Sequence, residues 1–201
     1  MIRVGVLDHG SGNLHSACRA LEAVGATVTV TGDRELLEAC DALVVPGVGA
    51  FAACMAGLRA IDGETLIRDW IVSGRPLLGI CVGHQILFEG GTEHGRVTPG
   101  LGVWSGQVAR LPAQRLPHMG WNTVRPPEHS RLFAGVTDER FYFVHSYAAL
   151  GPPEGTQTTL SDHEVPFVAA VERDNVFSTQ FHPEKSGSAG TRLLGNWLSQ
   201  A

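Results

Sequence analysis

The sequence predicts an α/β protein with a mostly parallel central sheet, helices on both faces of it, and antiparallel strands added by the second half. In the first half, from Ile2 to Gly90, short apolar segments rich in β-branched residues alternate with helical patterns. Such close alternation requires right-handed crossovers, which make neighbouring strands parallel and place helices on both sides. After Gly90, glycines, prolines and short alternating runs dominate, which is typical of antiparallel strands joined by turns.

The elements are expected in the following order. The strands of the first half are Ile2–Leu7, Thr27–Val30, Ala42–Val45 and Pro76–Cys81. The helices of the first half are Leu14–Val24, Arg34–Ala39, Ala52–Ala60 and Thr65–Ser73, with a further helix beginning at Gln85. The second half contributes the strands Val103–Leu111, Phe141–Leu150, Phe167–Glu172 and Val176–Phe181, a hairpin turn at Asp174 and Asn175, and a closing helix, Thr191–Gln200.

Composition narrows the classes of function. The chain of 201 residues is 43% hydrophobic and carries a formal net charge of −5 with a pI near 6.0. These values predict one well-buried domain over residues 1–201, and the lack of a Lys/Arg cluster argues against nucleic-acid binding. The four cysteines show no CxxC pairing, so neither a metal site nor a disulfide framework is expected, and a reducing, cytoplasmic setting fits. No signal peptide or membrane-spanning segment is predicted.

Cys81 is the strongest candidate for a catalytic residue. An apolar strand runs into Gly79-x-Cys81-x-Gly83, and the flanking glycines indicate a tight, strained turn that presents a nucleophile. A sulfur at the start of a helix is favoured as thiolate, and the N–H of Val82 is placed to bind an oxyanion. The other cysteines are expected to be ordinary buried residues: Cys18, Cys40 and Cys54.

His182 is the candidate base for this thiol. It follows the strand Val176–Phe181 and precedes Pro183 and Glu184. Residues two apart on an extended chain project to the same side, so His182 and Glu184 are predicted to form a base and its orienting carboxylate. Histidines in the first loop and in polar turns are expected at the surface: His9, His15, His94, His129 and His163.

A second glycine-rich turn, from Pro46 to Phe51, follows the third strand. It is expected at the carboxyl edge of the sheet beside Cys81, where open α/β sheets place their sites, and its N–H groups can face an oxyanion. The turn matches neither a dinucleotide-binding nor a Walker-type phosphate loop, so no cofactor is predicted.

These motifs together resemble the class I, or triad, glutamine amidotransferases. The resemblance depends on Gly79-x-Cys81-x-Gly83-x-Gln85 and the later His182-Pro183-Glu184, and it implies a three-layer, flavodoxin-like fold. Further segments resemble the glutaminase subunits of imidazole glycerol phosphate synthases, which serve histidine biosynthesis. They are Pro46–Phe51, Pro117–Asn122, Tyr142–Tyr147 and His182–Ser186, with the early Gly12-Asn13-Leu14. His84 departs from this pattern, because that subfamily commonly has Met at this position.

The resemblance implies glutamine as substrate and a Cys81–His182–Glu184 triad. Oxyanion donors would come from Val48, Gly49 and Val82, and the substrate would be held by Gly49, Gln85, His145, Ser146 and Tyr147. The implied partner is a (β/α)8-barrel cyclase in a heterodimer, which would receive the ammonia and stimulate a weak glutaminase. The implied interface residues are Asn13, Pro117, Met119, Trp121, Tyr142 and Lys185. Met119 and Trp121 suit a docking loop, although they could instead pack the core beneath it.

Other interpretations remain open from the sequence. The chain could be the glutaminase subunit of another synthase, of the anthranilate or carbamoyl-phosphate type. It could also be a non-catalytic, amidotransferase-like binding module, although the presence of Cys81, His182 and Glu184 together argues against that. A flavodoxin-like cofactor carrier is disfavoured because no phosphate-binding loop is present.

Overall fold

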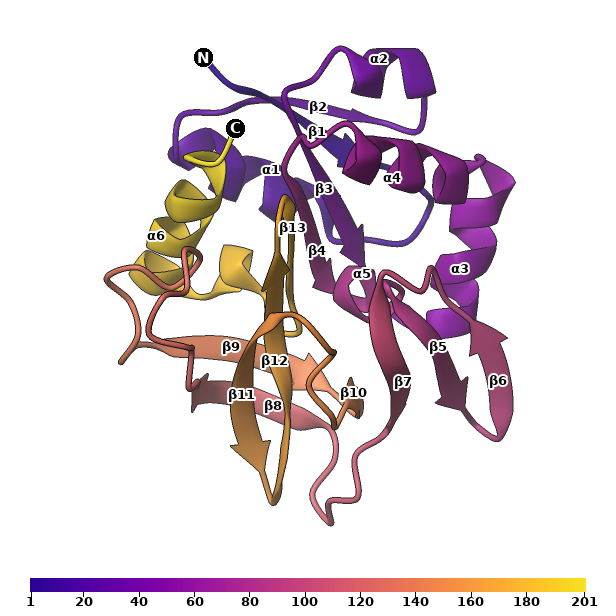
Figure 1. Ribbon diagram of the computed structural model, residues 1–201, viewed down its shortest axis with the longest axis vertical. Helices are drawn as coiled ribbons and strands as arrows, with labels where there is room; N and C mark the ends of the chain where they lie inside the picture. The colour runs from indigo at the N-terminus through magenta and orange to yellow at the C-terminus, as the bar shows by residue number, and fades with distance from the viewer.

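A seven-stranded sheet forms the centre of the computed structural model, which describes residues 1–201. Its strands are β1 (Arg3–Leu7), β2 (Thr27–Thr31), β3 (Ala42–Gly47), β4 (Leu77–Cys81), β11 (Gln157–His163), β12 (Val165–Arg173) and β13 (Val176–Thr179). They lie in the order β11-β12-β13-β4-β3-β1-β2 (Figure 1). The pairs from β13 to β2 are parallel, and β12 and β11 extend the sheet in antiparallel fashion. The hairpin between β12 and β13 was predicted, whereas β11 was not.

Helices cover both faces of this sheet. They are α1 (Leu14–Ala23), α2 (Arg34–Glu38), α3 (Phe51–Ala60), α4 (Gly63–Val72) and α6 (Gly187–Leu198). Helices α1 and α6 pack together on one side, and α2, α3 and α4 lie on the other (Figure 1). The three-layer α/β arrangement expected from the sequence is therefore confirmed, because β1 to β4 are joined by crossover helices that must alternate with buried strands.

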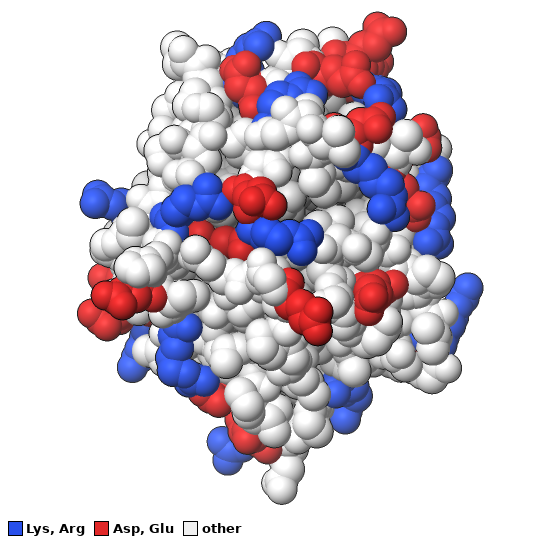
Figure 2. Space-filling model, viewed as in Figure 1, with Lys and Arg blue, Asp and Glu red and all other residues white.

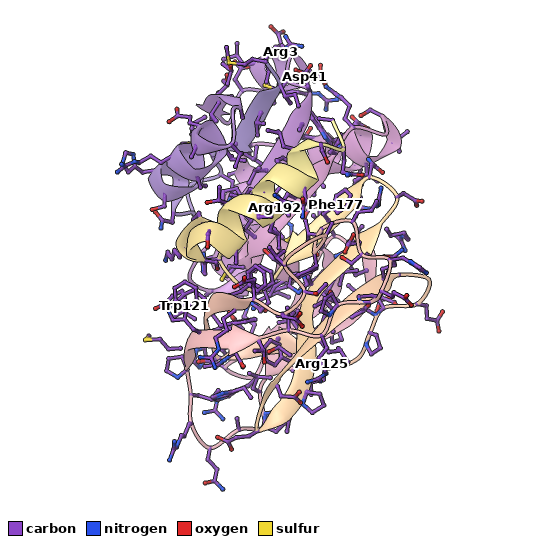
Figure 3. The ribbon with its side chains drawn as sticks, turned by 90° about the vertical axis from the view of Figure 1, so that its left-hand side faces the viewer. Arg3, Asp41, Trp121, Arg125, Phe177 and Arg192 are labelled. Carbon is purple, nitrogen blue, oxygen red and sulfur yellow. The ribbon has the colours of Figure 1, made fainter.

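Each layer is held by apolar contact with the strands. The central strands β3 and β4 are buried along their whole length, as strands covered on both faces must be. A cluster of 51 buried residues runs without a break from Val4 in the first strand to Trp197 in the last helix. At the far end of the sheet from the glycine turns, Arg3 forms an ion pair with Asp41 at 2.8 Å (Figure 3).

The second half also builds two small sheets that the sequence did not predict. One contains β5 (Phe88–Glu93), β6 (Arg96–Pro99), β7 (Trp104–Arg110) and β10 (Tyr147–Ala149), in the order β10-β7-β5-β6. The other is the antiparallel pair β8 (His118–Thr123) and β9 (Arg140–His145). The predicted strand Phe141–Leu150 is therefore interrupted at Ser146, where the chain leaves β9 and joins the other small sheet as β10.

The helix predicted to begin at Gln85 is wrong. Helix α5 (Val82–Gln85) is a single turn that ends there, and β5 begins at Phe88. Two glycines explain the change, because they let β5 approach its neighbours closely. A Cβ on Gly91 would lie 2.7 Å from the Phe51 ring, and one on Gly90 would lie 2.8 Å from the Gln107 side chain.

The surface carries mixed charge. On the face shown in Figure 2, acidic and basic side chains alternate, without a broad region of one sign. No helix is both long enough and apolar enough to cross a membrane.

Candidate active site

Three parallel strands end side by side and bring the predicted motifs together. Gly47, the last residue of β3, pairs with Cys81, the last residue of β4. On the other side of β4, Thr179 at the end of β13 pairs with Ile80. Because these strands are parallel, the glycine turn after β3, the cysteine and the His182 segment after β13 all meet at one edge of the sheet.

Cys81 lies in a strained elbow. Its φ of 58° and ψ of −111° are rare for a residue with a side chain and cost about 1–3 kcal/mol. The flanking glycines are required by close packing. A Cβ on Gly83 would lie 1.9 Å from the carbonyl oxygen of Val45, and one on Gly79 would lie 2.7 Å from the carbonyl oxygen of Gly83. The surrounding fold therefore holds the sulfur in a conformation that the local chain would not adopt alone.

His182 and Glu184 stand beside the sulfur. His182 lines the same cavity as Cys81, and its Nδ1 lies 2.7 Å from Oε1 of Glu184. Both side chains are 3% exposed. The two residues do not lie on one extended strand as predicted. Pro183 to Lys185 form a 3-10 turn, η1 (Pro183–Lys185), which brings the carboxylate round to the imidazole.

The backbone around His182 is fixed by β9. The N–H of His182 donates to the carbonyl oxygen of Tyr142 at 2.9 Å. The hydroxyl of Ser186 donates to the carbonyl oxygen of His182 at 2.6 Å and accepts from the N–H of Tyr142 at 3.0 Å. Ser186, which is 1% exposed, was not predicted as a site residue. It positions the base by joining η1 to β9.

Opposing effects act on the charge of His182. Burial lowers its pKa, but hydrogen bonds to Cys81 and Glu184 and their negative charge outweigh burial and raise the pKa to about 9. The site therefore favours an imidazolium next to the sulfur, an environment in which cysteine reacts as thiolate. Because the groups are coupled, the proton belongs to the pair rather than to one residue.

A cavity of about 250 Å³ opens over Cys81. This volume suits a ligand of amino-acid size rather than a nucleotide. All of the predicted oxyanion and substrate residues line it, and Glu93 and Val144 are additions that the sequence did not suggest. The lining residues are Val48, Gly49, Cys81, Val82, Gln85, Glu93, Val144, His145, Ser146, Tyr147, His182 and Lys185.

The turn that follows β3 is held from the loop after β1. The Nε2 atom of His9 lies 2.7 Å from the carbonyl oxygen of Pro46, and the hydroxyl of Ser11 donates to the carbonyl oxygen of Val48 at 2.6 Å. Gly49 has a φ of 79°, which favours glycine. The prediction that His9 is a surface residue is wrong, since it is only 5% exposed and is needed to hold this turn.

His84 is buried behind the elbow. Its Nδ1 lies 2.7 Å from Oγ of Ser178, and its ring packs edge-on against Phe88. Burial lowers its pKa to about 3, so it stays neutral at physiological pH. Its position matches a residue that supports the elbow without titrating.

Gln180 is a further residue that the sequence analysis missed. It is fully buried, and its Nε2 atom lies 4.0 Å from Sγ of Cys81. Its Oε1 accepts from Nε2 of Gln85 at 2.9 Å, and the same nitrogen donates to the carbonyl oxygen of Tyr147 at 2.9 Å. The sequence gives no distinct signal for it, because Gln180 follows two other polar residues, Ser178 and Thr179.

The six residues expected at an interface can all be reached from solvent. Met119 is 62% exposed and Trp121 is 53% exposed, so they do not pack the core. They belong to strand β8 rather than to the docking loop expected, and Trp121 lies at the edge of the molecule (Figure 3). The remaining four are exposed or half-buried: Asn13, Pro117, Tyr142 and Lys185. No group of three or more His, Cys, Asp or Glu side chains is arranged to hold a metal ion.

Comparison with known proteins agrees with this geometry. Residues 5–201 match the family model of class-I glutamine amidotransferases. A protein of Cutibacterium acnes named imidazole glycerol phosphate synthase subunit HisH is 60% identical over 99% of this chain and 97% of its own length. The protein of the same name from Nocardia farcinica is 59% identical over 97% of this chain and 96% of its own length.

Solved structures show the same fold. A crystal structure of a glutamine amidotransferase superposes with a TM-score of 0.78 at 23% identity, covering 98% of this chain and 99% of that one. A structure of PurLQS from Thermotoga maritima gives a TM-score of 0.73 at 19% identity, with 99% of each chain covered. The chain therefore belongs to the class-I glutamine amidotransferases, and among them to the family of imidazole glycerol phosphate synthase subunits HisH.

Proposed function

We propose that the chain hydrolyses the side-chain amide of glutamine with Cys81 as nucleophile and passes the ammonia to a cyclase partner that makes imidazole glycerol phosphate. The observation that carries the proposal is that Cys81 and His182 line one cavity of amino-acid size, and that Glu184 contacts the imidazole of His182. The relatives' name, imidazole glycerol phosphate synthase subunit HisH, supports the pathway, and their sequence identity to this chain disfavours an anthranilate or carbamoyl-phosphate synthase subunit.

The reaction proceeds through a thioester. The Cys81 thiolate attacks the amide carbon, and the carbonyl electrons move to oxygen, where backbone N–H groups of Val82 and of the Val48–Gly49 turn stabilise the negative charge. His182 then donates its proton to the amide nitrogen as the C–N bond breaks and ammonia leaves. Water, deprotonated by His182, attacks the γ-glutamyl thioester, which releases glutamate and restores the thiolate. Glu184 orients the imidazole in both steps.

The cavity wall suits an amino acid. Glu93 already accepts the N–H of Phe51 with one oxygen at 2.9 Å, and its second oxygen is available for the α-ammonium group of glutamine. Both N–H groups of the Gln85 side chain are engaged, so Gln85 offers only its oxygen to a ligand. Backbone groups of the segment from His145 to Tyr147 complete the wall.

A bound partner explains why a separate subunit would produce ammonia from glutamine. Ammonia released into neutral water becomes mostly ammonium, which is not a nucleophile, so a synthase gains from receiving it directly. We assign the docking side to β8 and to the rim of the cavity, where Met119, Trp121 and Lys185 are exposed. The partner is a (β/α)8-barrel cyclase in a heterodimer, and its binding stimulates a weak glutaminase.

The test uses the chain reconstituted with its cyclase. Cys81→Ser is expected to abolish synthesis supported by glutamine and to leave synthesis supported by ammonium salts at the wild-type rate. Cys54→Ser, at another buried cysteine, is the matched control and is expected to keep both activities. Glutamine turnover by the Cys81→Ser complex would overturn the nucleophile assignment, and a wild-type chain that fails to bind any cyclase would overturn the pathway.

A further inference from the structure

A chain of hydrogen bonds joins strand β8 to the wall of the cavity. β8 pairs with β9 so that His118 lies opposite His145, a residue of the cavity wall. Side chains on β8 alternate in direction. Met119 and Trp121 point to solvent, whereas His118 is 5% exposed and points inward. The same strand therefore has one face toward the proposed partner and one toward the site.

The groups at the two ends of this series of hydrogen bonds decide which ring nitrogens carry a hydrogen. Nδ1 of His145 lies 3.0 Å from the carbonyl oxygen of Tyr147, which only accepts, so this nitrogen carries the hydrogen. Nε2 of His145 must then accept, and it lies 2.9 Å from Nδ1 of His118. Nε2 of His118 in turn accepts from Nδ2 of Asn122 at 3.2 Å.

Asn122 anchors the outer end. Its Oδ1 accepts from the N–H of Thr123 at 2.8 Å, and its second N–H donates to the carbonyl oxygen of Asp162 at 2.8 Å. The side-chain amide thus has one orientation. Burial first, and the neighbouring histidines second, lower the pKa of His118 to about 4 and that of His145 to about 3. Both rings are neutral at physiological pH, as the chain of donors and acceptors requires.

At its inner end, the series of hydrogen bonds leads to the residues next to Cys81. The carbonyl oxygen of Tyr147 accepts a second bond from Nε2 of Gln85, which also donates to Oε1 of Gln180. Nε2 of Gln180 faces Sγ of Cys81 at 4.0 Å. Hydrogen bonds therefore connect β8 to the residue that lies against the sulfur.

We propose that His118 and Asn122 are positioning residues for glutamine hydrolysis, which set the cavity wall through His145 and transmit to it the docking of the partner on Met119 and Trp121. This inference rests on the proposed function. His118 and Asn122 are not in contact with the substrate in this proposal. His118 acts only through His145 and Tyr147, and docking of the partner on the exposed outer face of β8 is what these hydrogen bonds transmit.

Simple packing is the competing explanation. The ring of His118 stacks on His163 with centroids 4.3 Å apart and on Phe143 at 4.9 Å. His118→Phe keeps an aromatic ring in that stack but removes both nitrogens, so the two explanations predict opposite results. His163→Phe is the matched control, because it changes the stacking partner without interrupting the chain from Asn122 to Tyr147.

The experiment measures kcat and KM for glutamine in the reconstituted complex, with and without the cyclase's nucleotide ligand. His118→Phe is expected to lower the stimulated kcat about 5- to 150-fold, the usual range of coupling between sites. The unstimulated rate should change less, so that the stimulation ratio falls. Synthesis from ammonium salts should stay at the wild-type rate, as should both activities of His163→Phe. His118→Asn, which restores a donor near the Nδ1 position, should recover part of the stimulated rate.

Two results would overturn the proposal: a His118→Phe complex stimulated like the wild type, or a His163→Phe complex that loses as much. Should His118→Phe not fold, Asn122→Leu removes the outer donor at a half-buried position and is expected to lower the stimulation ratio in the same direction. An unchanged ratio in Asn122→Leu also contradicts the proposal. Glutamine turnover that does not depend on Cys81 is a separate outcome, since it would refute the proposed function and not the role of His118 and Asn122.

Discussion

His182 is the residue whose surroundings decide how the site works. It is buried, yet its pKa is raised to about 9, because the hydrogen bonds and negative charge of Cys81 and Glu184 outweigh the effect of burial. In the proposed mechanism, an imidazolium next to the sulfur favours the thiolate and places a proton near the leaving ammonia. The same arrangement makes the stability of the protein depend on pH.

The raised pKa of His182 makes a contribution to stability that depends on pH. The unfolded histidine loses its proton near pH 6.5, whereas the folded one keeps it to about pH 9. The contribution of His182 to the free energy of unfolding is therefore fully present below pH 6.5 and decreases as pH rises between these values. In the wild type, the proton that a Cys81 thiolate has lost offsets this decrease, so the contribution of His182 is measured without the thiol.

Urea denaturation of Cys81→Ser, and of Cys81→Ser combined with His182→Asn, at several pH values measures this effect, because the coupled thiol is then absent. Adding His182→Asn should remove that part of the pH dependence, whereas adding His129→Asn, a change at an exposed histidine, should retain it. Parallel curves for Cys81→Ser with and without His182→Asn would contradict a pKa raised by Glu184.

At the scale of elements, the site depends on the close approach of β3 and the turn after β4. A Cβ on Gly83 would meet the carbonyl oxygen of Val45 at 1.9 Å, and the contact is with backbone, which cannot rotate away. Gly83→Ala should therefore destabilise the fold by at least about 3 kcal/mol. It should also slow alkylation of Cys81 by a glutamine analogue, since the elbow must open.

Gly195→Ala is the matched control for this change. Gly195 lies in helix α6 with open space around it, so alanine there should stabilise the protein by about 0.5–1 kcal/mol through helix propensity. Chemical denaturation of the two variants measures both values. Equal stability of Gly83→Ala and the wild type would show that the elbow is looser than described.

The sequence was informative wherever a motif was local. The spacing of Gly79, Cys81 and Gly83, and that of His182 and Glu184, led to residues that the fold brings together. The order of strands and helices up to β4 followed from alternation. Packing between residues far apart in the chain could not be predicted from the sequence. The helix expected at Gln85 gave way to β5 because two glycines allow contacts with Phe51 and Gln107, which lie far away in the chain.

The contacts around Cys81, His182 and Glu184 could not be predicted from the sequence either. Gln180 and Ser186 look like ordinary polar residues in the sequence, and their roles depend on partners in β9 and in the elbow. Strand β8 was not predicted because its segment is short, contains Gly120 and follows prolines. Pairing with β9 stabilises it, and such pairing between segments about 20 residues apart leaves no local pattern.

For the molecule as a whole, we expect the surface around Trp121 to meet the partner. Trp121 is half exposed on β8, and large aromatic residues at the centre of interfaces often contribute 2 kcal/mol or more. Trp121→Ala should weaken cyclase binding roughly 10- to 100-fold in calorimetry. Leu36→Ala, at a similarly exposed residue of α2, should leave the affinity unchanged. Equal affinities for the wild type and Trp121→Ala would place the interface elsewhere.

Mass spectrometry of peptides after treatment with a glutamine-analogue electrophile shows which thiol is the nucleophile. We expect a single adduct, on Cys81, whose formation is slowed by glutamine. Cys18 is only partly buried and serves as the internal comparison, since a merely accessible thiol would react there without protection by glutamine. An adduct on Cys18, Cys40 or Cys54 with Cys81 unmodified would show that Cys81 is not the nucleophile.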